Sequence, residues 1–152
     1  MNERPTLPGG LDPVPPLLDK LLCVLLVAAA VVIVWLLAGV SPDDRGHGTH
    51  EQLGMEPCGW AAELGKPCPT CGVTTSATHL IHLQPIRAFV IQPFGAALAL
   101  LGLILAGLAL DSLIRGRSLS ARIRRAPYGR IVVGMVLLFF ASWGYLWVTW
   151  DG

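Results

Sequence analysis

Charged side chains are scarce in this sequence. Lysine, arginine, aspartate and glutamate make up 14% of its 152 residues, whereas about 25% is usual in a soluble domain. Because 53% of the residues are hydrophobic, polar side chains are too few to cover a compact globule. The composition therefore excludes an ordinary soluble domain and favours a protein that is surrounded by lipid.

Two other classes of protein lack the residues they need. Four cysteines are too few for a disulfide-dense secreted scaffold. No block of positive charge resembles a nucleic-acid-binding tail, and the arginines are not interleaved with aromatic side chains that could stack on bases. We therefore expect no nucleic-acid partner.

Long apolar runs are the main feature that is present. A helix of about 20 apolar residues crosses the ~30 Å hydrocarbon layer of a membrane. The runs predict transmembrane helices at residues 17–40, 89–110 and 131–150. The first run is longer than the apolar core of a signal peptide, which has about 7–15 residues, so we expect it to be retained. The predicted fold is an all-α membrane protein with the lipid bilayer as its partner.

The remaining segments differ from one another in composition. Residues 1–16 are rich in proline and glycine, which predicts a flexible tail. Residues 41–87 form the only sizeable polar region and hold three cysteines and all four histidines; we call this region the cysteine loop. Residues 111–130 carry six arginines against one aspartate.

The distribution of basic residues predicts an orientation. Short cytoplasmic loops are enriched in lysine and arginine. If the 111–130 loop is cytoplasmic, the N-terminal tail is also inside, and eight basic residues lie inside against three outside. Trp35 near the end of the first run and the tryptophans that end the third run agree with this arrangement. We expect the cysteine loop and the C-terminus to lie outside.

The distinctive chemistry is in the stretch Cys68-Pro69-Thr70-Cys71-Gly72. Two cysteines separated by two residues can share a tetrahedral metal ion or close a small disulfide. Pro69 limits the backbone between them, and Gly72 can adopt the positive φ that turns amides toward the sulfurs.

A short helix is predicted to follow the motif, at about residues 74–83. Thr74 or Thr75 is the expected N-terminal cap of this helix. The helix is too short to span a membrane, so we expect it to lie at the interface. Its dipole would favour thiolates in the motif and lower their pKa.

Three interpretations of the cysteines remain open. In the first, Cys58, Cys68 and Cys71 bind zinc or a similar ion, and one histidine completes the site. In the second, Cys68 and Cys71 form a reversible redox pair, although the thioredoxin-like βαβ setting is absent. In the third, no cofactor is bound and Cys58 forms a structural disulfide with Cys68 or Cys71. The histidines considered as the fourth ligand are His50, His79 and His82.

The motif also resembles a known family. Gly65 to Thr75, followed by a short helix and Gln92-Pro93-Phe94-Gly95, resembles domain of unknown function family 2752. Its members are small bacterial inner-membrane proteins with a Cys-Pro-x-Cys-Gly-x-Thr motif. Cys58 is similar to the extra upstream cysteine of one branch. Many members have arginine where this chain has Thr75.

The resemblance implies a bacterial cytoplasmic membrane location but supplies no reaction. We expect a non-enzymatic accessory or interaction subunit, with an unidentified membrane-protein partner, whose outer loop is organised by its cysteines. The alternative is a membrane thiol-redox or metal-binding protein that uses the Cys68–Cys71 pair.

Overall fold

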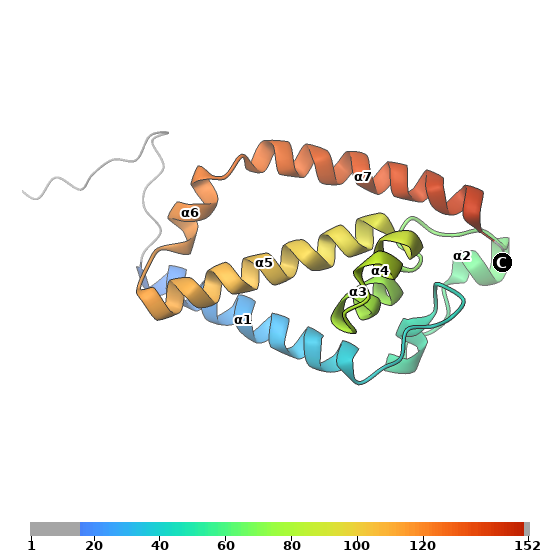
Figure 1. The fold of residues 1–152 in the computed structure, drawn as a ribbon, viewed down its shortest axis with the longest axis horizontal. Coiled ribbons are helices and arrows are strands. Elements are labelled where there is room, and N and C mark those ends of the chain that lie inside the picture. Colours follow the sequence, from blue (N-terminus) through green and yellow to red (C-terminus); the bar gives the residue numbers. More distant parts are fainter. Residues whose placement is uncertain (1–15, 151–152) are drawn as a thin grey trace, which may run out of the picture.

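The structure, a computed structural model, describes residues 16–150, and helices are the regular secondary structure of this part of the chain (Figure 1). The tail predicted at residues 1–16 lies outside this range except for Pro16, which begins the first helix. No strand occurs within the range, so the predicted all-α fold is confirmed. The elements are α1 (Pro16–Ala38), the 3-10 helix η1 (Thr49–Leu53), α2 (Gly59–Leu64), α3 (Val73–Ile81), α4 (Pro85–Ile91), α5 (Pro93–Arg115), α6 (Leu119–Arg125) and α7 (Tyr128–Thr149).

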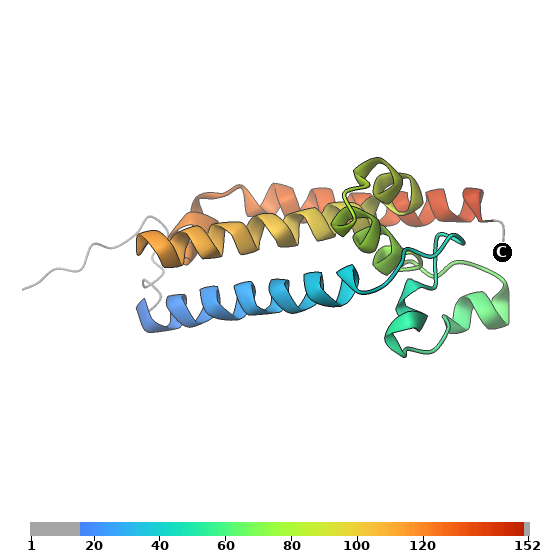
Figure 2. The ribbon, with the colours of Figure 1, turned by 60° about the horizontal axis from the view of Figure 1, so that its bottom comes forward.

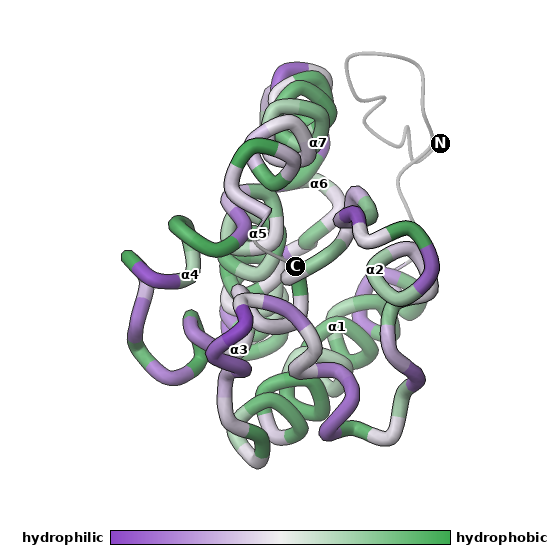
Figure 3. Tube along the Cα trace, turned by 90° about the vertical axis from the view of Figure 1, so that its right-hand side faces the viewer, coloured by the Kyte–Doolittle hydropathy of each residue, from purple (hydrophilic) through white to green (hydrophobic). Residues whose placement is uncertain are grey.

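Three of these helices, α1, α5 and α7, are long and apolar enough to cross a membrane. Each has 22 or 23 residues and is therefore about 33–35 Å long at 1.5 Å per residue. Only 11% of the most apolar stretch of each helix is buried inside the protein. The hydrophobic colouring extends along all three helices, whereas hydrophilic residues gather in the connections (Figure 3). Their exposed apolar faces identify a multi-pass membrane protein whose solvent is lipid.

Helix α5 is central in the bundle. It packs extensively against α1 and less extensively against α7 (Figures 1 and 2). The N-terminal end of α7 and the short helix α6 lie at one end of the bundle, and α2, α3 and the end of α7 lie toward the other (Figure 1). The Arg-rich connection and the cysteine loop are therefore at opposite ends.

The second spanning helix begins at Pro93, whereas the sequence predicts a start at residue 89. Residues 85–91 form the separate helix α4, and Gln92 between the two helices is extended, with φ −154°. A residue that precedes proline is sterically disfavoured in the helical conformation, which explains the break. At its other end α5 continues to Arg115, five residues beyond the predicted end, and stops at Gly116 with φ +64°.

The C-terminal half of α7 is joined to the rest of the protein by hydrogen bonds. The Ser142 hydroxyl accepts one from the backbone N–H of Phe94 at 3.3 Å, and the Tyr145 hydroxyl donates one to the Val90 carbonyl at 2.7 Å. These bonds connect α7 to the start of α5 and to α4, close to the cysteine loop.

At the opposite end, α1 holds α6 in place through a single buried carboxylate. The two oxygens of Asp19 accept hydrogen bonds from the backbone N–H groups of Leu119 at 3.0 Å and Ser120 at 2.9 Å. These amides begin α6 and would otherwise lack partners. Cys23, one turn further along α1, is buried beside Leu119, so it packs as a small apolar side chain.

We predict that Asp19→Ala destabilises the protein by about 1–3 kcal/mol, because two buried N–H groups lose a charged acceptor. The melting temperature in detergent should fall by several degrees. Asp44→Ala, which removes an exposed carboxylate from the cysteine loop, is the matched control and should leave it unchanged. Equal melting temperatures for the two variants would contradict the assigned role of Asp19.

Candidate functional site

The two motif cysteines lie in a tight turn that leads directly into α3. The Cys71 N–H donates to the Cys68 carbonyl at 3.0 Å, and the Val73 N–H donates to the Thr70 carbonyl at 3.1 Å. Gly72 occupies the N-cap position of α3 with φ +81°. The sequence predicts Thr74 or Thr75 there, but neither side chain caps this helix.

Gly72 is required by its surroundings as well as by its backbone conformation. A Cβ atom at this position would lie 2.7 Å from the Gly46 carbonyl oxygen, much closer than such atoms approach. The Gly46–Gly48 loop thus packs directly against the turn that carries Cys71. Glycine is the only residue without a Cβ, so the contact and the positive φ both select it.

A buried glutamine fixes the turn to the membrane-spanning bundle. Gln92 is fully buried, and its Nε2 donates to the Pro69 carbonyl at 3.4 Å. Its Oε1 accepts from the Gly95 N–H at 2.6 Å, which caps the start of α5. On the same side, the Ser76 hydroxyl of α3 lies within hydrogen-bond distance of the Ala88 and Gln92 carbonyls, at 2.8 and 3.1 Å.

Thr75 connects α3 to the polar start of the cysteine loop. Its buried hydroxyl accepts a hydrogen bond from Thr49 at 2.8 Å, and Thr49 accepts one from the Asp43 N–H at 3.0 Å. The position at which many relatives are expected to carry arginine therefore has a structural role in this chain. Thr74 instead lines an apolar groove between α1, α3 and α5.

Two ion pairs hold the first part of the cysteine loop together. Arg45 bridges the carboxylates of Asp43 at 2.8 Å and Glu51 at 3.1 Å. The Arg45 guanidinium holds the pKa of the Asp43 carboxyl below its usual range. This ion-paired segment carries His47 and Thr49 and fixes their backbone.

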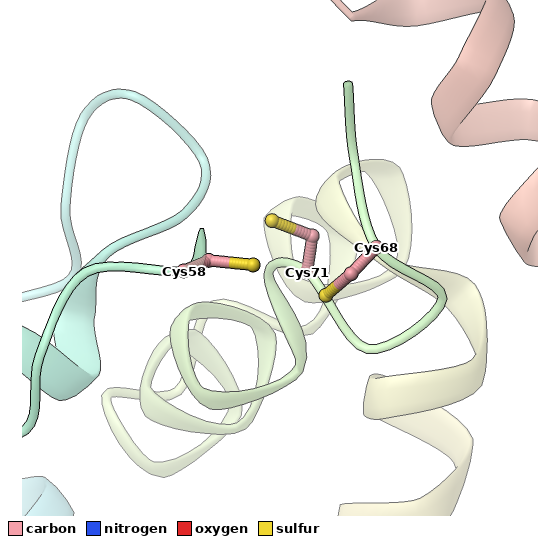
Figure 4. A group of neighbouring side chains, drawn as sticks. All are labelled: Cys58, Cys68 and Cys71. Carbon is pink, nitrogen blue, oxygen red and sulfur yellow. The ribbon is translucent and has the colours of Figure 1, made fainter. Parts of the chain in front are cut away.

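The third cysteine of the loop joins the motif pair in space. Cys58 occupies the N-cap position of α2, and its sulfur points toward those of Cys68 and Cys71 (Figure 4). The three sulfur atoms all lie within 4.8 Å of one another. Cys71 is buried, the other two are half-buried, and all three are free thiols in this structure.

The thiols differ in how readily they ionise. Burial, together with the negative charge of Cys68 and Cys58, raises the pKa of Cys71 to about 12. The expected lowering by the dipole of α3 is therefore outweighed at Cys71. Burial also opposes ionisation of Cys58, but the Ala61 and Trp60 amides and the neighbouring thiols stabilise its thiolate and bring its pKa below the usual value.

The three histidines predicted as ligands make other contacts. His50 Nε2 lies 3.2 Å from the Glu56 carbonyl, His79 Nδ1 lies 2.8 Å from Gln84 Oε1, and His82 Nε2 lies 3.3 Å from the Leu37 carbonyl. Within the part of the chain that the structure describes, the compact ligand group contains the cysteines and no histidine.

Sequence reasoning missed two residues near the cysteines. Gln92 was noted only as part of a family pattern, yet it fixes the turn. His47, between two glycines, has the pattern of a solvated loop, but it lines the same cavity as Cys71, of about 210 Å³. Its ring also lies 4.5 Å from that of Trp150. No local pattern in the sequence indicates this placement, because it depends on contacts between distant segments.

Comparison with known proteins gives one match. A family model, Protein of unknown function (DUF2752), matches residues 58–106. Residues 58–106 belong to this family. The matched region covers about a third of the chain and contains the three clustered cysteines, α3 and the start of α5. No curated protein and no solved structure matched the chain.

We predict that Gly72→Ala destabilises the protein by roughly 2 kcal/mol or more, because a left-handed conformation costs about 1–2 kcal/mol for alanine and the contact with Gly46 is added to it. The melting temperature in detergent measures the effect. Gly102→Ala in α5 is the control: its Cβ would meet open space, and alanine should stabilise the helix slightly. If the two variants melted at the same temperature, the packing around Gly72 would be wrongly assigned.

Proposed function

We propose that this membrane protein binds one zinc-type metal ion through the thiolates of Cys58, Cys68 and Cys71. The observation that carries the proposal is the mutual approach of three sulfur atoms, all within 4.8 Å. A Zn–S distance of about 2.3 Å in a tetrahedral site places ligand sulfurs about 3.8 Å apart. A disulfide would use two of the three sulfurs and would not account for the convergence of the third.

The charges of the site favour the same interpretation. Three thiolates this close would repel one another, and the raised pKa of Cys71 reflects first its burial and then that repulsion. A divalent cation between the sulfurs would offset the repulsion and favour loss of the thiol protons. Thiolates are also the ligands that select soft or borderline ions such as zinc.

Three protein ligands leave the fourth position of a tetrahedral ion to be filled. His47 is our candidate, because it lines the cavity that Cys71 also lines. Its Nδ1 lies 3.0 Å from the Arg45 carbonyl. A carbonyl can only accept, so Nδ1 carries the proton and Nε2 keeps a lone pair for a metal, as in many metal-bound histidines.

Thiol-disulfide exchange is the second candidate function. Cys58 is half-exposed, and its lowered pKa favours the thiolate, which is the form that attacks disulfides. Both motif sulfurs lie within reach of it. In this case Cys58 would belong to the reactive set, together with the predicted Cys68–Cys71 pair.

Either chemistry is compatible with an accessory or interaction role in a bacterial cytoplasmic membrane. Trp60 and Leu64 of α2 are exposed beside the cysteines and offer a surface to a membrane-protein partner. We further propose that the cysteine end faces outward. The support is the excess of arginine in the connection around α6, at the opposite end of the bundle.

The metal proposal predicts one zinc ion per chain when the protein is purified without chelator and analysed by elemental mass spectrometry. Serine at any one of the three clustered cysteines should weaken zinc binding by roughly 100-fold or more, since loss of an outer-shell partner alone typically costs 10–100-fold. Cys23→Ser, far from the cluster, should bind zinc like the unaltered protein.

The same titrations test the fourth ligand. His47→Ala should weaken zinc binding, whereas His50→Ala in the same loop should not. A larger loss in the His50, His79 or His82 variant would exclude His47 and leave the three-cysteine site intact. Absence of bound metal, with a cysteine pair that oxidises and reduces readily, would instead favour thiol-disulfide exchange.

Orientation is tested with single cysteines introduced into a protein whose four native cysteines are replaced by serine. A membrane-impermeant maleimide added to intact cells should label Asp44→Cys in the exposed part of the cysteine loop. It should not label Ser118→Cys before α6 until the cells are opened. The reverse pattern would invert the proposed topology.

A further inference from the structure

A second cavity lies at the Arg-rich end of the bundle, at the opposite end from Cys58, Cys68 and Cys71. It has a volume of about 460 Å³ and is lined by the start of α1, the end of α5 and α6. Lys20, Arg117 and Arg124 line it. The only acidic side chain among its described lining residues is Asp19, whose two oxygens are occupied by the amides of Leu119 and Ser120.

Two buried polar atoms at this cavity have no hydrogen-bond partner among the described residues. They are the hydroxyl oxygen of Ser112, a residue only 2% exposed, and Nε of Arg124. A buried polar group without a partner typically costs about 1–3 kcal/mol, so such atoms mark places that a bound group completes. Both atoms belong to residues that line the cavity, and both can donate a hydrogen bond.

The charged neighbours decide which kind of group fits. Two of the other arginines of this end, Arg115 and Arg122, are neutralised by pairing with Asp111. No carboxylate partner of Arg117 or Arg124 occurs in the described range 16–150. A cavity with a hydroxyl donor, a guanidinium N–H donor and surplus positive charge is suited to an anion with several acceptor oxygens.

We propose that this cavity binds a phosphate group through Ser112 and Arg124, with Lys20 and Arg117 contributing positive charge. The group can come from an anionic phospholipid, whose headgroup lies at the same depth as the ends of spanning helices, or from free phosphate. This site is independent of the metal proposal, because it shares no residue with the cysteine cluster.

The test uses the full-length protein in neutral detergent and measures binding of phosphatidylglycerol, phosphatidylcholine and inorganic phosphate separately. Native mass spectrometry counts bound lipid, and the shift in melting temperature with ligand concentration gives affinity. Binding of phosphatidylglycerol in preference to phosphatidylcholine identifies a lipid headgroup as the source. Binding of inorganic phosphate alone identifies a soluble anion. Either result supports the phosphate site, and binding of neither overturns it.

Arg124→Ala and Arg125→Ala form a matched pair, because they remove the same charge from adjacent positions of α6 and only Arg124 lines the cavity. Non-specific attraction to an anionic surface should change about fivefold in each variant. Loss of a charge-assisted hydrogen bond should weaken Arg124→Ala by roughly a further tenfold or more. Ser112→Ala, which keeps all charges, should also weaken binding, and melting temperatures without ligand check that each variant is folded. Equal effects of the two arginine variants, or none from Ser112→Ala, would overturn the proposal.

Discussion

The cysteine turn is held against the membrane-spanning bundle by the buried side chain of Gln92. One end of its amide accepts from the Gly95 N–H at the start of α5, and the other donates to the Pro69 carbonyl between the two motif cysteines. Few residues can satisfy a helix terminus and a separate turn at once, because both a donor and an acceptor are needed on one short side chain. Pro93 breaks the helix between α4 and α5, and the Gln92 side chain caps the new helix start and holds the turn that carries Cys71. The loop that carries the cysteines is thereby attached to the start of a membrane-spanning helix.

The two ends of the bundle use the same physical device with different chemistry. At the cysteine end a neutral amide satisfies buried backbone groups, and at the opposite end the Asp19 carboxylate satisfies the first amides of α6. Lipid offers no hydrogen bonds, so where a helix is interrupted near a membrane, side chains must supply hydrogen-bond partners for the free backbone groups. Each of these capped helix starts lies beside a feature to which we assign a ligand. At one end this is the three converging thiols, and at the other it is the basic cavity with unpartnered donors.

The spanning helices could be predicted from the sequence because lipid imposes a simple requirement, a long apolar run. The exact ends of these helices could not be predicted, because they depend on local backbone conformation. Examples are the extended backbone of Gln92 before α5 and the left-handed conformation of Gly116 after it. The cysteine cluster could also be predicted from local sequence. Cys68 and Cys71 are separated by only two residues, and the short chain between Cys58 and Cys68 allows Cys58 to join them. The residues that surround the cysteines could be identified only from the folded structure. Gly72 caps α3 because Gly46 packs on it, and His47 faces the Cys71 cavity through contacts among distant segments.

The central claim is that Cys58, Cys68 and Cys71 share one metal ion, and X-ray absorption at the zinc edge tests it most directly. The measurement should be made on protein purified from cells without chelator or added metal. We predict about three sulfur neighbours near 2.3 Å and one nitrogen neighbour near 2.0–2.1 Å, the usual zinc distances to thiolate and imidazole. Protein that carries no metal, or zinc surrounded only by oxygen and nitrogen, would contradict the account.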